Sequence, residues 1–328
     1  MYPDMPRISV LMSVYNGARY VKTALESVLS QTFSDFEFVI VDDGSTDETA
    51  AILAHYPDPR IVCLHNQINL GLTESLNRGL AVTRGEYVAR QDADDVSLPH
   101  RFERQVAAFT ENPDWVAVFP AYDQIDEWGN ALGVVRPPDT SQAIREHLFY
   151  DNRLGHGSAV VRRGALEHVG EYDTSYATGQ DLDLWLRLSE HYSLGSTWEV
   201  LYRFRMHAGS VTNRRREVMR HNANRARLNA FNRCGGAGLS PRAVSRFHFS
   251  LGLHALSKGD RAEAASRFRL SASQDVESAK TNDDLLSMAI SLAIELGYLD
   301  RDPAFPRRNA TVASDFIRAI LECLPEAR

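Results

Sequence analysis

Three carboxylates lie within four residues in the segment Asp92-Ala93-Asp94-Asp95, which follows a short apolar run and precedes Leu98-Pro99. Carboxylates this close together repel one another unless a cation or hydrogen-bond donors lie among them. A hard divalent cation that is held by a carboxylate and by phosphate oxygens is the usual solution. A second interpretation, that these Asp side chains are solvated or close a turn, stays open from the segment alone.

Strand-like and helix-like patterns alternate through the first hundred residues. Short, almost continuous apolar runs predict buried strands at residues 8–14, 36–41, 60–65 and 86–90. Apolar spacing predicts helices between them at residues 21–29, 45–56 and 72–83. The second of these helices is expected to begin at a capping box, Ser45-Thr46-Asp47-Glu48. Such alternation predicts βαβ units and a parallel sheet that is covered by helices.

Polar clusters follow the first, second and fourth expected strands, at residues 13–17, 42–45 and 92–95. Open parallel sheets bind ligands beyond the carboxyl ends of their strands, so the three clusters should meet along one rim. This position favours a functional role for the carboxylates over a solvated turn. The pattern Asp92-x-Asp94-x-Val96 also fits an aspartyl phosphatase, but there it normally ends the first strand of the domain rather than the fourth.

The rest of the chain predicts a second, helical region. Strands are expected near residues 116–119 and 158–161, and a helix just after Gly179-Gln180-Asp181. The segment Cys234-Gly235-Gly236-Ala237-Gly238 is typical of a linker. Helical patterns follow it around residues 244–251, from Asp260, and at residues 284–296 and 312–324. We therefore expect a catalytic domain at residues 1–234 and a helical domain at residues 235–328.

Composition limits the classes of partner and the compartment. The 328 residues are 44% hydrophobic and carry a formal charge of −7, which argues against general attraction to nucleic acid. The three cysteines are far apart and show no metal-ligand spacing, which is typical of a reduced cytoplasmic protein. No run approaches the ~18–20 apolar residues that span a bilayer, and residues 1–6 do not form a signal peptide.

One basic stretch stands out in this acidic chain. Residues 203–233 hold nine arginines and a single acid, Glu217. A solvated helical face is one interpretation. The other is contact with the donor diphosphate, with a lipid-linked pyrophosphate acceptor, or peripherally with an anionic membrane at its inner face. We expect Arg214, Arg215 and Arg216 to form a basic edge beside the ligand cleft.

Several motifs in this chain resemble those of the family 2 glycosyltransferases, in the same order and over about residues 7–212. They are Ile8–Gly17, Ser27–Thr32, Val39–Asp47 and Arg84–Tyr87. The resemblance implies the GT-A fold, a Rossmann-like, mostly parallel α/β sheet flanked by helices, here with a small all-α region after it. It also implies inverting transfer of a sugar from a nucleotide-diphosphate donor to a hydroxyl of a glycan, polysaccharide or lipid-linked saccharide.

The resemblance assigns the donor side of the site. Ser13, Tyr15 and Asp43 would contact the base and ribose, and Asp92 would approach ribose or sugar hydroxyls. Asp94 would bind the Mn²⁺ or Mg²⁺ ion that bridges the diphosphate, which would neutralise the leaving group. From the residues alone, Tyr15 can equally be a core aromatic residue and Asp43 a turn residue.

The resemblance also assigns a base and the residues that close the site. In Gln180–Arg187, Asp181 would accept the proton of the acceptor hydroxyl, and Gln180 replaces the Glu that members often carry there. His207 would bind the metal or the diphosphate, and His156 and Trp185 would line the acceptor side. As alternatives, Asp181 can cap its helix and His207 can be an ordinary loop histidine.

Two other classes of protein share some of these sequence features. A metal-dependent nucleotidyltransferase has a similar sheet and carboxylate site, but its glycine-rich phosphate loop with a basic residue is absent after the first strand. An inactive nucleotide-sugar-binding protein is the second, and the joint presence of Asp94, Asp181 and His207 argues against it.

Overall fold

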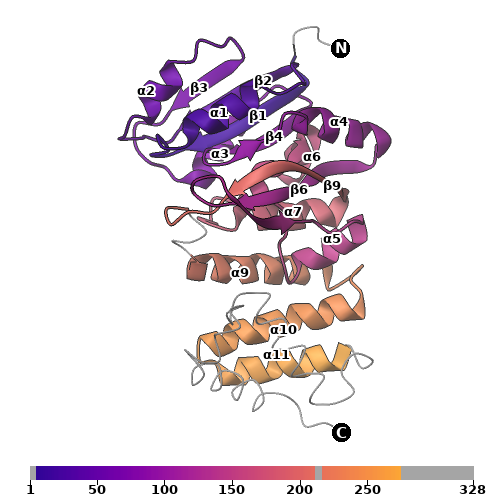
Figure 1. Ribbon diagram of the computed structural model, residues 1–328. Helices are drawn as coiled ribbons and strands as arrows, with labels where there is room; N and C mark the ends of the chain where they lie inside the picture. The colour runs from indigo at the N-terminus through magenta and orange to yellow at the C-terminus, as the bar shows by residue number, and fades with distance from the viewer. Residues whose placement is uncertain (1–4, 211–215, 275–328) are drawn as a thin grey trace. The chain divides into compact units, whose positions relative to one another are not determined.

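The computed structural model describes residues 5–210 and 216–274 (Figure 1). The chain divides into two compact units. Unit 1 contains the residues up to Arg145 and Arg153–Ala226, and unit 2 contains Glu146–Asn152 and the residues from Arg227 onward. The expected boundary at residues 234 and 235 differs from this division, because α9 (Arg216–Cys234) contributes to both units.

Unit 1 is built on a mixed sheet of nine strands in the order β3-β2-β1-β4-β8-β6-β9-β5, with β7 paired to β6. Its first half is parallel and follows the sequence prediction closely. The four strands are β1 (Ile8–Val14), β2 (Phe36–Asp42), β3 (Ile61–His65) and β4 (Tyr87–Asp92). Every residue of β2 is buried, as expected of a central strand that is covered on both faces.

The second half of the sheet brings distant segments together. β8 (Val160–Arg162) lies antiparallel between β4 and β6 (Trp115–Ile125). β9 (Ser193–Arg205) runs parallel to β6 and also pairs with β5 (Val96–Ser97), while β7 (Ala131–Val135) forms a hairpin with β6. The sequence analysis did not predict β9, because its 13 residues mix exposed polar and buried positions without a clear alternation.

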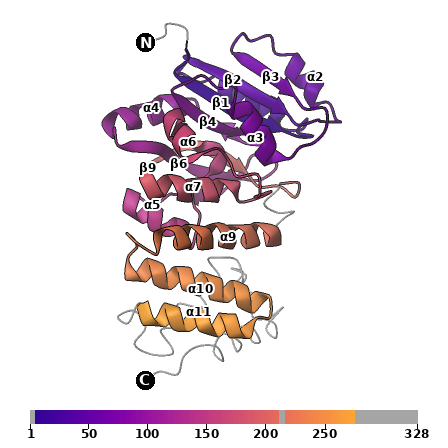
Figure 2. The ribbon, with the colours of Figure 1, turned by 180° about the vertical axis from the view of Figure 1, so that it is seen from behind.

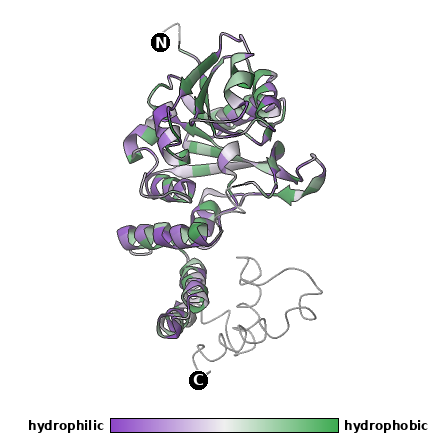
Figure 3. Cartoon of the chain, turned by 90° about the vertical axis from the view of Figure 1, so that its left-hand side faces the viewer, coloured by the Kyte–Doolittle hydropathy of each residue, from purple (hydrophilic) through white to green (hydrophobic). Residues whose placement is uncertain are grey.

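Helices cover both faces of the parallel half (Figure 2). α1 (Val21–Leu29) and α4 (Arg101–Glu111) share a core with the even-numbered residues of β1, among them Val10 and Met12. α3 (Leu72–Leu80) packs on the opposite face, where Gly79 lies so close to Leu11 and Val41 that a Cβ would collide with the Leu11 side chain. Figure 3 shows hydrophobic residues gathered in the strands of this sheet.

The predicted capping box does not form. α2 begins only at Thr49 and ends at Ala54, and its N-cap residue Glu48 makes no side-chain cap. Ser45 instead accepts a hydrogen bond from the Asn16 backbone at 3.0 Å, so its side chain is used between two loops rather than within a helix. The interpretation of Ser45–Glu48 as a capping box was therefore wrong.

The remaining helices of unit 1 surround the second half of the sheet. They are α5 (Ser141–Leu148, whose last residues belong to unit 2), the 3₁₀ turn η1 (His156–Ser158), α6 (Arg163–Val169) and α7 (Gln180–His191). α7 begins where the sequence predicted it.

Unit 2 contains the helix pair α10 (Pro241–Ser257) and α11 (Arg261–Gln274). Ser240 caps the first helix by accepting a hydrogen bond from Ala243 N, and Asp260 accepts from Glu263 N at the start of the second. Phe247, Phe249 and Phe268 are buried in this unit. The helices expected at residues 284–296 and 312–324 lie outside the described residues.

Candidate active site

Strand pairing brings the polar clusters to one rim of the sheet. Ser13 near the end of β1 pairs in register with Val41 of β2 and with Asp92 of β4, and Val14 pairs with Asp42. The carboxyl ends of three adjacent parallel strands therefore meet there, as the sequence predicted. Ser13 is partly exposed and lies directly beside Asp92 across the strands.

Side-chain hydrogen bonds connect the loop after β1 to the residues that follow β2. Asn16, at φ 50°, accepts a hydrogen bond from Thr46 N at 2.8 Å. Thr49 Oγ1 accepts from Gly17 N at 2.9 Å, and Asp47 Oδ2 accepts from Ala18 N at 3.1 Å. Tyr15, at the base of this loop, is 49% exposed, so it is not a core aromatic residue and its ring is open to a ligand.

Asp43 has a structural role of its own. Its side chain is 2% exposed and accepts three hydrogen bonds, from Asn66 Nδ2 at 2.7 Å, Leu70 N at 2.8 Å and Gly71 N at 2.9 Å. These bonds close the loop that leads into α3. Contact between Asp43 and a nucleotide stays a prediction.

Asp92 is held by a buried arginine that the sequence analysis did not select. Arg90 is 1% exposed and donates from Nη2 to Asp92 Oδ1. Burial raises the pKa of Asp92, and the charge of Arg90 opposes that rise. Gly157 of η1 lies against the same carboxylate, because a Cβ there would stand 2.5 Å from Asp92 Oδ2. A lone Arg in the apolar strand before the acidic segment was the available signal for Arg90.

The structure brings Asp94 and His207 together across 113 residues. The Asp94 Oδ2 to His207 Nε2 distance is 2.8 Å, and the side chains are 33% and 15% exposed. The end of β9 is fastened beside them, since Arg205 N donates to Asp95 Oδ1 at 2.7 Å and Arg205 Nε donates to Asp94 O at 2.8 Å. His207 is thus placed against Asp94 rather than left as an unconnected loop histidine.

Asp94 and His207 suit a cation that arrives with its own oxygen ligands. Carboxylate and imidazole both bind Mn²⁺. Within residues 5–210 and 216–274, no group of three His, Cys, Asp or Glu side chains is arranged to hold a metal ion alone. A divalent ion at this pair would therefore depend on phosphate oxygens and water, as Mg²⁺ sites commonly do.

Asp181 lies in the first turn of α7 and is partly exposed. The N-cap position is Gly179, at φ 76° and ψ 13°, and no side chain caps the helix. The interpretation of Asp181 as the cap was therefore wrong. Burial raises the pKa of Tyr172, and the negative charges of Asp181 and Asp92 raise it further. The charges of Asp181 and Asp92 thus both act on the Tyr172 hydroxyl.

His156 and Trp185 differ in exposure, although both were expected to line the acceptor side. Trp185 is 0% exposed and packs edge-on against Phe119 and His156, at ring distances of 4.9 and 6.1 Å. A fully buried ring cannot line an acceptor surface, so the expectation for Trp185 is corrected: it supports His156 from the core. His156 is partly exposed beside Arg90 and Tyr172.

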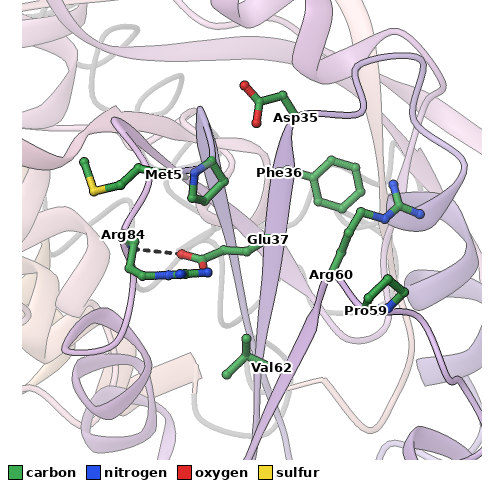
Figure 4. A pocket seen from close by; sticks show the side chains of 9 residues that line it. Met5, Asp35, Phe36, Glu37, Pro59, Arg60, Val62 and Arg84 are labelled. Carbon is green, nitrogen blue, oxygen red and sulfur yellow. Dashed lines mark hydrogen bonds and ion pairs between the residues drawn. The ribbon is translucent and has the colours of Figure 1, made fainter. Parts of the chain in front are cut away.

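The pocket in Figure 4 lies at the amino ends of the parallel strands, opposite to the ends that carry the polar clusters. It has a volume of about 330 Å³ and is lined by residues that precede or begin the parallel strands, including Pro6, Phe36, Arg60 and Arg84. Glu37 there is bound by Arg84 at 2.6 Å. Because these are the amino ends of the strands, this pocket is separate from the rim that carries Asp92 and Asp94.

The described part of the arginine-rich stretch is used largely within the protein. Arg205 donates to backbone carbonyls, and so does Arg225, which also lies 3.9 Å from the Tyr176 ring. Arg227 donates to Leu148 O at 2.9 Å within unit 2. Arg214, Arg215 and Arg216 were expected to form a basic edge. Arg214 and Arg215 lie outside the described residues, and so does the side chain of Arg216. Among the described helices, none combines the length and apolar character that crossing a bilayer requires.

Solved structures share this architecture. S. aureus TarS, in complex with UDP, superposes with a TM-score of 0.56 at 17% identity, covering 83% of this chain and 93% of that one. The mannosyltransferase PcManGT of Pyrobaculum calidifontis, in complex with GDP-Man and Mn²⁺, superposes with a TM-score of 0.54 at 18% identity, covering 97% and 86%. The fold is that of the GT-A glycosyltransferases.

Sequence comparison gives the family. Residues 9–170 match Glycosyl transferase family 2. An uncharacterized glycosyltransferase of Methanocaldococcus jannaschii is 34% identical over 209 residues, which cover 62% of this chain and 72% of the relative. EpsE of Bacillus subtilis, named as a glycosyltransferase, is 35% identical over 207 residues, which cover 61% and 73%. The chain belongs to glycosyl transferase family 2 and is a glycosyltransferase enzyme.

Proposed function

We propose that this enzyme inverts the anomeric configuration while it moves a sugar from a nucleotide-diphosphate donor to a hydroxyl of a glycan, polysaccharide or lipid-linked saccharide. One observation carries the proposal. Asp94 and His207 form a partly exposed pair, 2.8 Å apart, at the strand ends where parallel sheets bind ligands.

The donor would bind along the rim from β2 to β4. Ser13 and Tyr15 are exposed enough to meet base and ribose, and Asp92 is oriented by Arg90 toward ribose or sugar hydroxyls. Asp43 would act here through the loop that it closes or through its remaining lone pair. The complexes of two neighbours in fold with UDP and with GDP-Man support a nucleotide sugar as the donor class.

Asp94 and His207 would hold a divalent cation, Mn²⁺ or Mg²⁺, against the diphosphate. When bound, this cation supplies neutralisation of the charge that develops on the leaving diphosphate. The Mn²⁺ in the PcManGT complex supports the choice of metal. Arg205 donates hydrogen bonds to Asp94 O and to the Asp95 side chain. These bonds would keep the metal-binding segment in place before the donor binds.

Asp181 would be the general base. Its carboxylate would take the proton of the acceptor hydroxyl as that oxygen bonds to the anomeric carbon. The bond from that carbon to the diphosphate oxygen breaks on the opposite side, and its electron pair leaves with the nucleoside diphosphate. One displacement inverts the anomeric centre. Gln180, buried beside Asp181, cannot take this proton.

The acceptor would be met by the arginine-rich stretch at residues 203–233. Arg214, Arg215 and Arg216 would attract a phosphate-bearing or lipid-linked acceptor. Replacing all three by Gln should then weaken use of such an acceptor most at low salt, because charge attraction fades beyond about 8 Å at physiological ionic strength.

A donor screen tests the proposed function. Thermal unfolding would be followed with UDP-GlcNAc, GDP-Man and other nucleotide sugars, with Mn²⁺ or with excess EDTA. A true donor should raise the unfolding temperature only with the metal, since it binds the folded state. NMR of the purified product should show the inverted anomer. Transfer at full rate in EDTA would contradict the metal role, and a retained anomer would contradict the displacement.

A further inference from the structure

The contacts of His156 determine which of its ring nitrogens carries a proton. Nε2 lies 3.2 Å from Arg90 Nε and 2.8 Å from the Tyr172 hydroxyl. A guanidinium group has N–H donors and no acceptor, so Nε2 must accept the hydrogen bond from Arg90. Nε2 therefore has no proton, and its single lone pair is shared between the Arg90 Nε–H and the Tyr172 hydroxyl, which donates the shorter bond. The proton of the neutral ring is on Nδ1.

Arg90 cannot turn away from this contact. Its Nη1 donates to Leu11 O of β1 and, at 2.8 Å, to Gln91 O, and its Nη2 donates to Asp92 Oδ1. Two of these acceptors are backbone carbonyls that are fixed by the sheet. The arginine is also 1% exposed, and the carboxylate of Asp92 balances its charge. The sheet therefore imposes the hydrogen-bonding state of His156 through Arg90.

The ring of His156 is also fixed in orientation. It lies edge-on to Tyr172 and to the buried Trp185, at ring distances of 5.5 and 6.1 Å. Both backbone groups of Tyr172 bond to the Asn77 amide, at 2.8 and 3.1 Å, which holds the hydroxyl in position. Rigid support of this kind pre-organises a polar group for its ligand.

Electrostatics agrees with a neutral ring. Burial lowers the pKa of His156 well below its ordinary value, and the charge of Arg90 lowers it further. The charged and titratable groups that contact it are Arg90 on β4 and Tyr172 after α6, and the charges of Asp92 on β4 and Asp181 on α7 act on Tyr172 in turn. No hydrogen bond within the described residues uses Nδ1, and the side chain is partly exposed.

We infer that His156 is a fixed, neutral hydrogen-bond donor whose Nδ1–H binds a hydroxyl oxygen of a saccharide in the site, with Arg90 as the positioning residue that sets its tautomer. The inference rests on the proposed glycosyl transfer. A neutral N–H matches a neutral sugar oxygen, whereas a diphosphate attracts cations. An imidazole locked in this way does not take up the acceptor proton, which leaves that step to Asp181.

Nitrogen NMR of the ¹⁵N-histidine-labelled protein tests the tautomer without any assay of activity. The His156 signals would be assigned by their loss in His156→Gln. We expect shifts of an Nδ1-protonated neutral ring that do not change between pH 5.5 and 8.5. Arg90→Lys, which keeps the charge but loses the Nε–H, should let the tautomers mix. Protonation at Nε2, or titration of the parent near the ordinary histidine pKa, would overturn the inference.

Matched variants test the donor role. The amide of Asn can place an N–H near the position of Nδ1, whereas the amide of Gln reaches the position of Nε2. With UDP-GlcNAc or GDP-Man, whichever the enzyme uses, His156→Asn should keep kcat/KM within ~3-fold of the parent, whereas His156→Gln and His156→Ala should lose about 10-fold to 100-fold. His55→Asn, at an exposed histidine, is the control.

Two results separate the possible failures. If His156→Asn is as impaired as His156→Ala while both unfold at the temperature of the parent, His156 does not act as a donor. If the parent transfers no sugar from any donor, the proposed function fails while the NMR result still decides the tautomer.

Discussion

At the scale of single residues, Asp94 is the test of metal dependence. Asp94→Asn keeps the size of the side chain but removes the anionic ligand beside His207. Under the proposed function a cation would stabilise the leaving diphosphate, so turnover should fall on the order of 10²-fold or more. Turnover would be measured across a Mn²⁺ titration, with the exposed Asp114→Asn as control. Turnover of Asp94→Asn equal to that of the parent at every Mn²⁺ concentration would remove Asp94 from the metal site.

Asp181 is the test of base catalysis. Asp181→Asn cannot accept a proton at neutral pH, so kcat should fall by at least ~10²-fold, the usual range for acid–base catalysis. Donor affinity, measured by calorimetry, should change little because Asp181 lies on α7, whereas the proposed donor site is at the ends of β1, β2 and β4. Asp35→Asn, at the amino edge of the sheet, serves as the control. A parallel collapse of donor affinity would place Asp181 in donor binding instead.

Residue types and their place after a strand were enough to select Asp92 and Asp94, and the resemblance to the family selected Asp181 and His207. They were not enough to find Arg90 or Tyr172. The importance of Arg90 depends on four contacts, to Leu11, Gln91, Asp92 and His156, and two of these partners lie 66 or more residues away. The exposure of Trp185 was misjudged for the same reason, because a tryptophan in an amphipathic helix can face either side until its neighbours are known.

At the scale of elements, η1 depends on a residue without a side chain. Gly157→Ala would bring a Cβ to 2.5 Å from Asp92 Oδ2. Overpacking of this kind typically costs 1–3 kcal/mol. Here it would also push on the Tyr202 hydroxyl and on the Asp92 carboxylate, for which we propose a role in donor binding. We expect KM for the donor to rise about 10-fold or more. Gly164→Ala in α6, where no atom lies within 4 Å of the new Cβ, is the matched control. Similar KM values for the two variants would contradict this view of η1.

The helix pair of unit 2 should be sensitive to acid. His248 on α10 lies 3.4 Å from Arg267 Nη1, and burial, with the charge of Arg267, lowers its pKa to about 4. The unfolded chain binds this proton below pH ~6.5, whereas the folded chain binds it only near pH 4. Neutral His248 therefore makes its full contribution to the free energy of unfolding above pH ~6.5. This contribution decreases by up to about 3 kcal/mol as the pH falls toward 4.

Chemical unfolding of the parent and of His248→Gln between pH 4 and 7.5 would measure this effect. Gln does not titrate, so the variant should show a flatter dependence of the unfolding free energy on pH in this window. Curves of identical slope would show that His248 does not couple folding to protonation.

Local periodicity predicted β1 to β4 and α7, because these elements have apolar runs or spacings that are visible in a short window. It did not predict β9, which is defined by its long parallel pairing with β6 rather than by its own alternation. The capping box failed for a similar reason, since Ser45 and Asp47 bond to the loop after β1.

At the scale of the whole molecule, the boundary between the units has a consequence for truncation. Phe149 belongs to unit 2 and packs edge-on against Phe247, with ring centroids 5.9 Å apart. A chain that is cut after residue 234 loses this partner and exposes a buried phenylalanine, at a cost of roughly 1.5–3 kcal/mol. We expect the cut chain to unfold at a lower temperature and to bind a hydrophobic dye.

Phe149→Ser in the cut chain is the informative companion, because it should reduce dye binding without restoring the unfolding temperature. If the cut chain unfolds at the temperature of the full chain and binds no dye, residues 1–234 are a self-sufficient domain, as the sequence analysis expected.

The attachment of β9 to the acidic segment has a consequence for synthesis on the ribosome. Asp95 receives its hydrogen bond from Arg205 N, 110 residues later, and Asp94 meets His207 after 113 residues. At ~5–20 residues per second, the segment waits about 5 to 20 s for these partners. During that interval the nascent chain carries three adjacent carboxylates with β9 still missing. The pair of Asp94 and His207 is thus completed only after β9 has left the ribosome, so a chain that stalls before residue 205 exposes an acidic strand end that lacks His207.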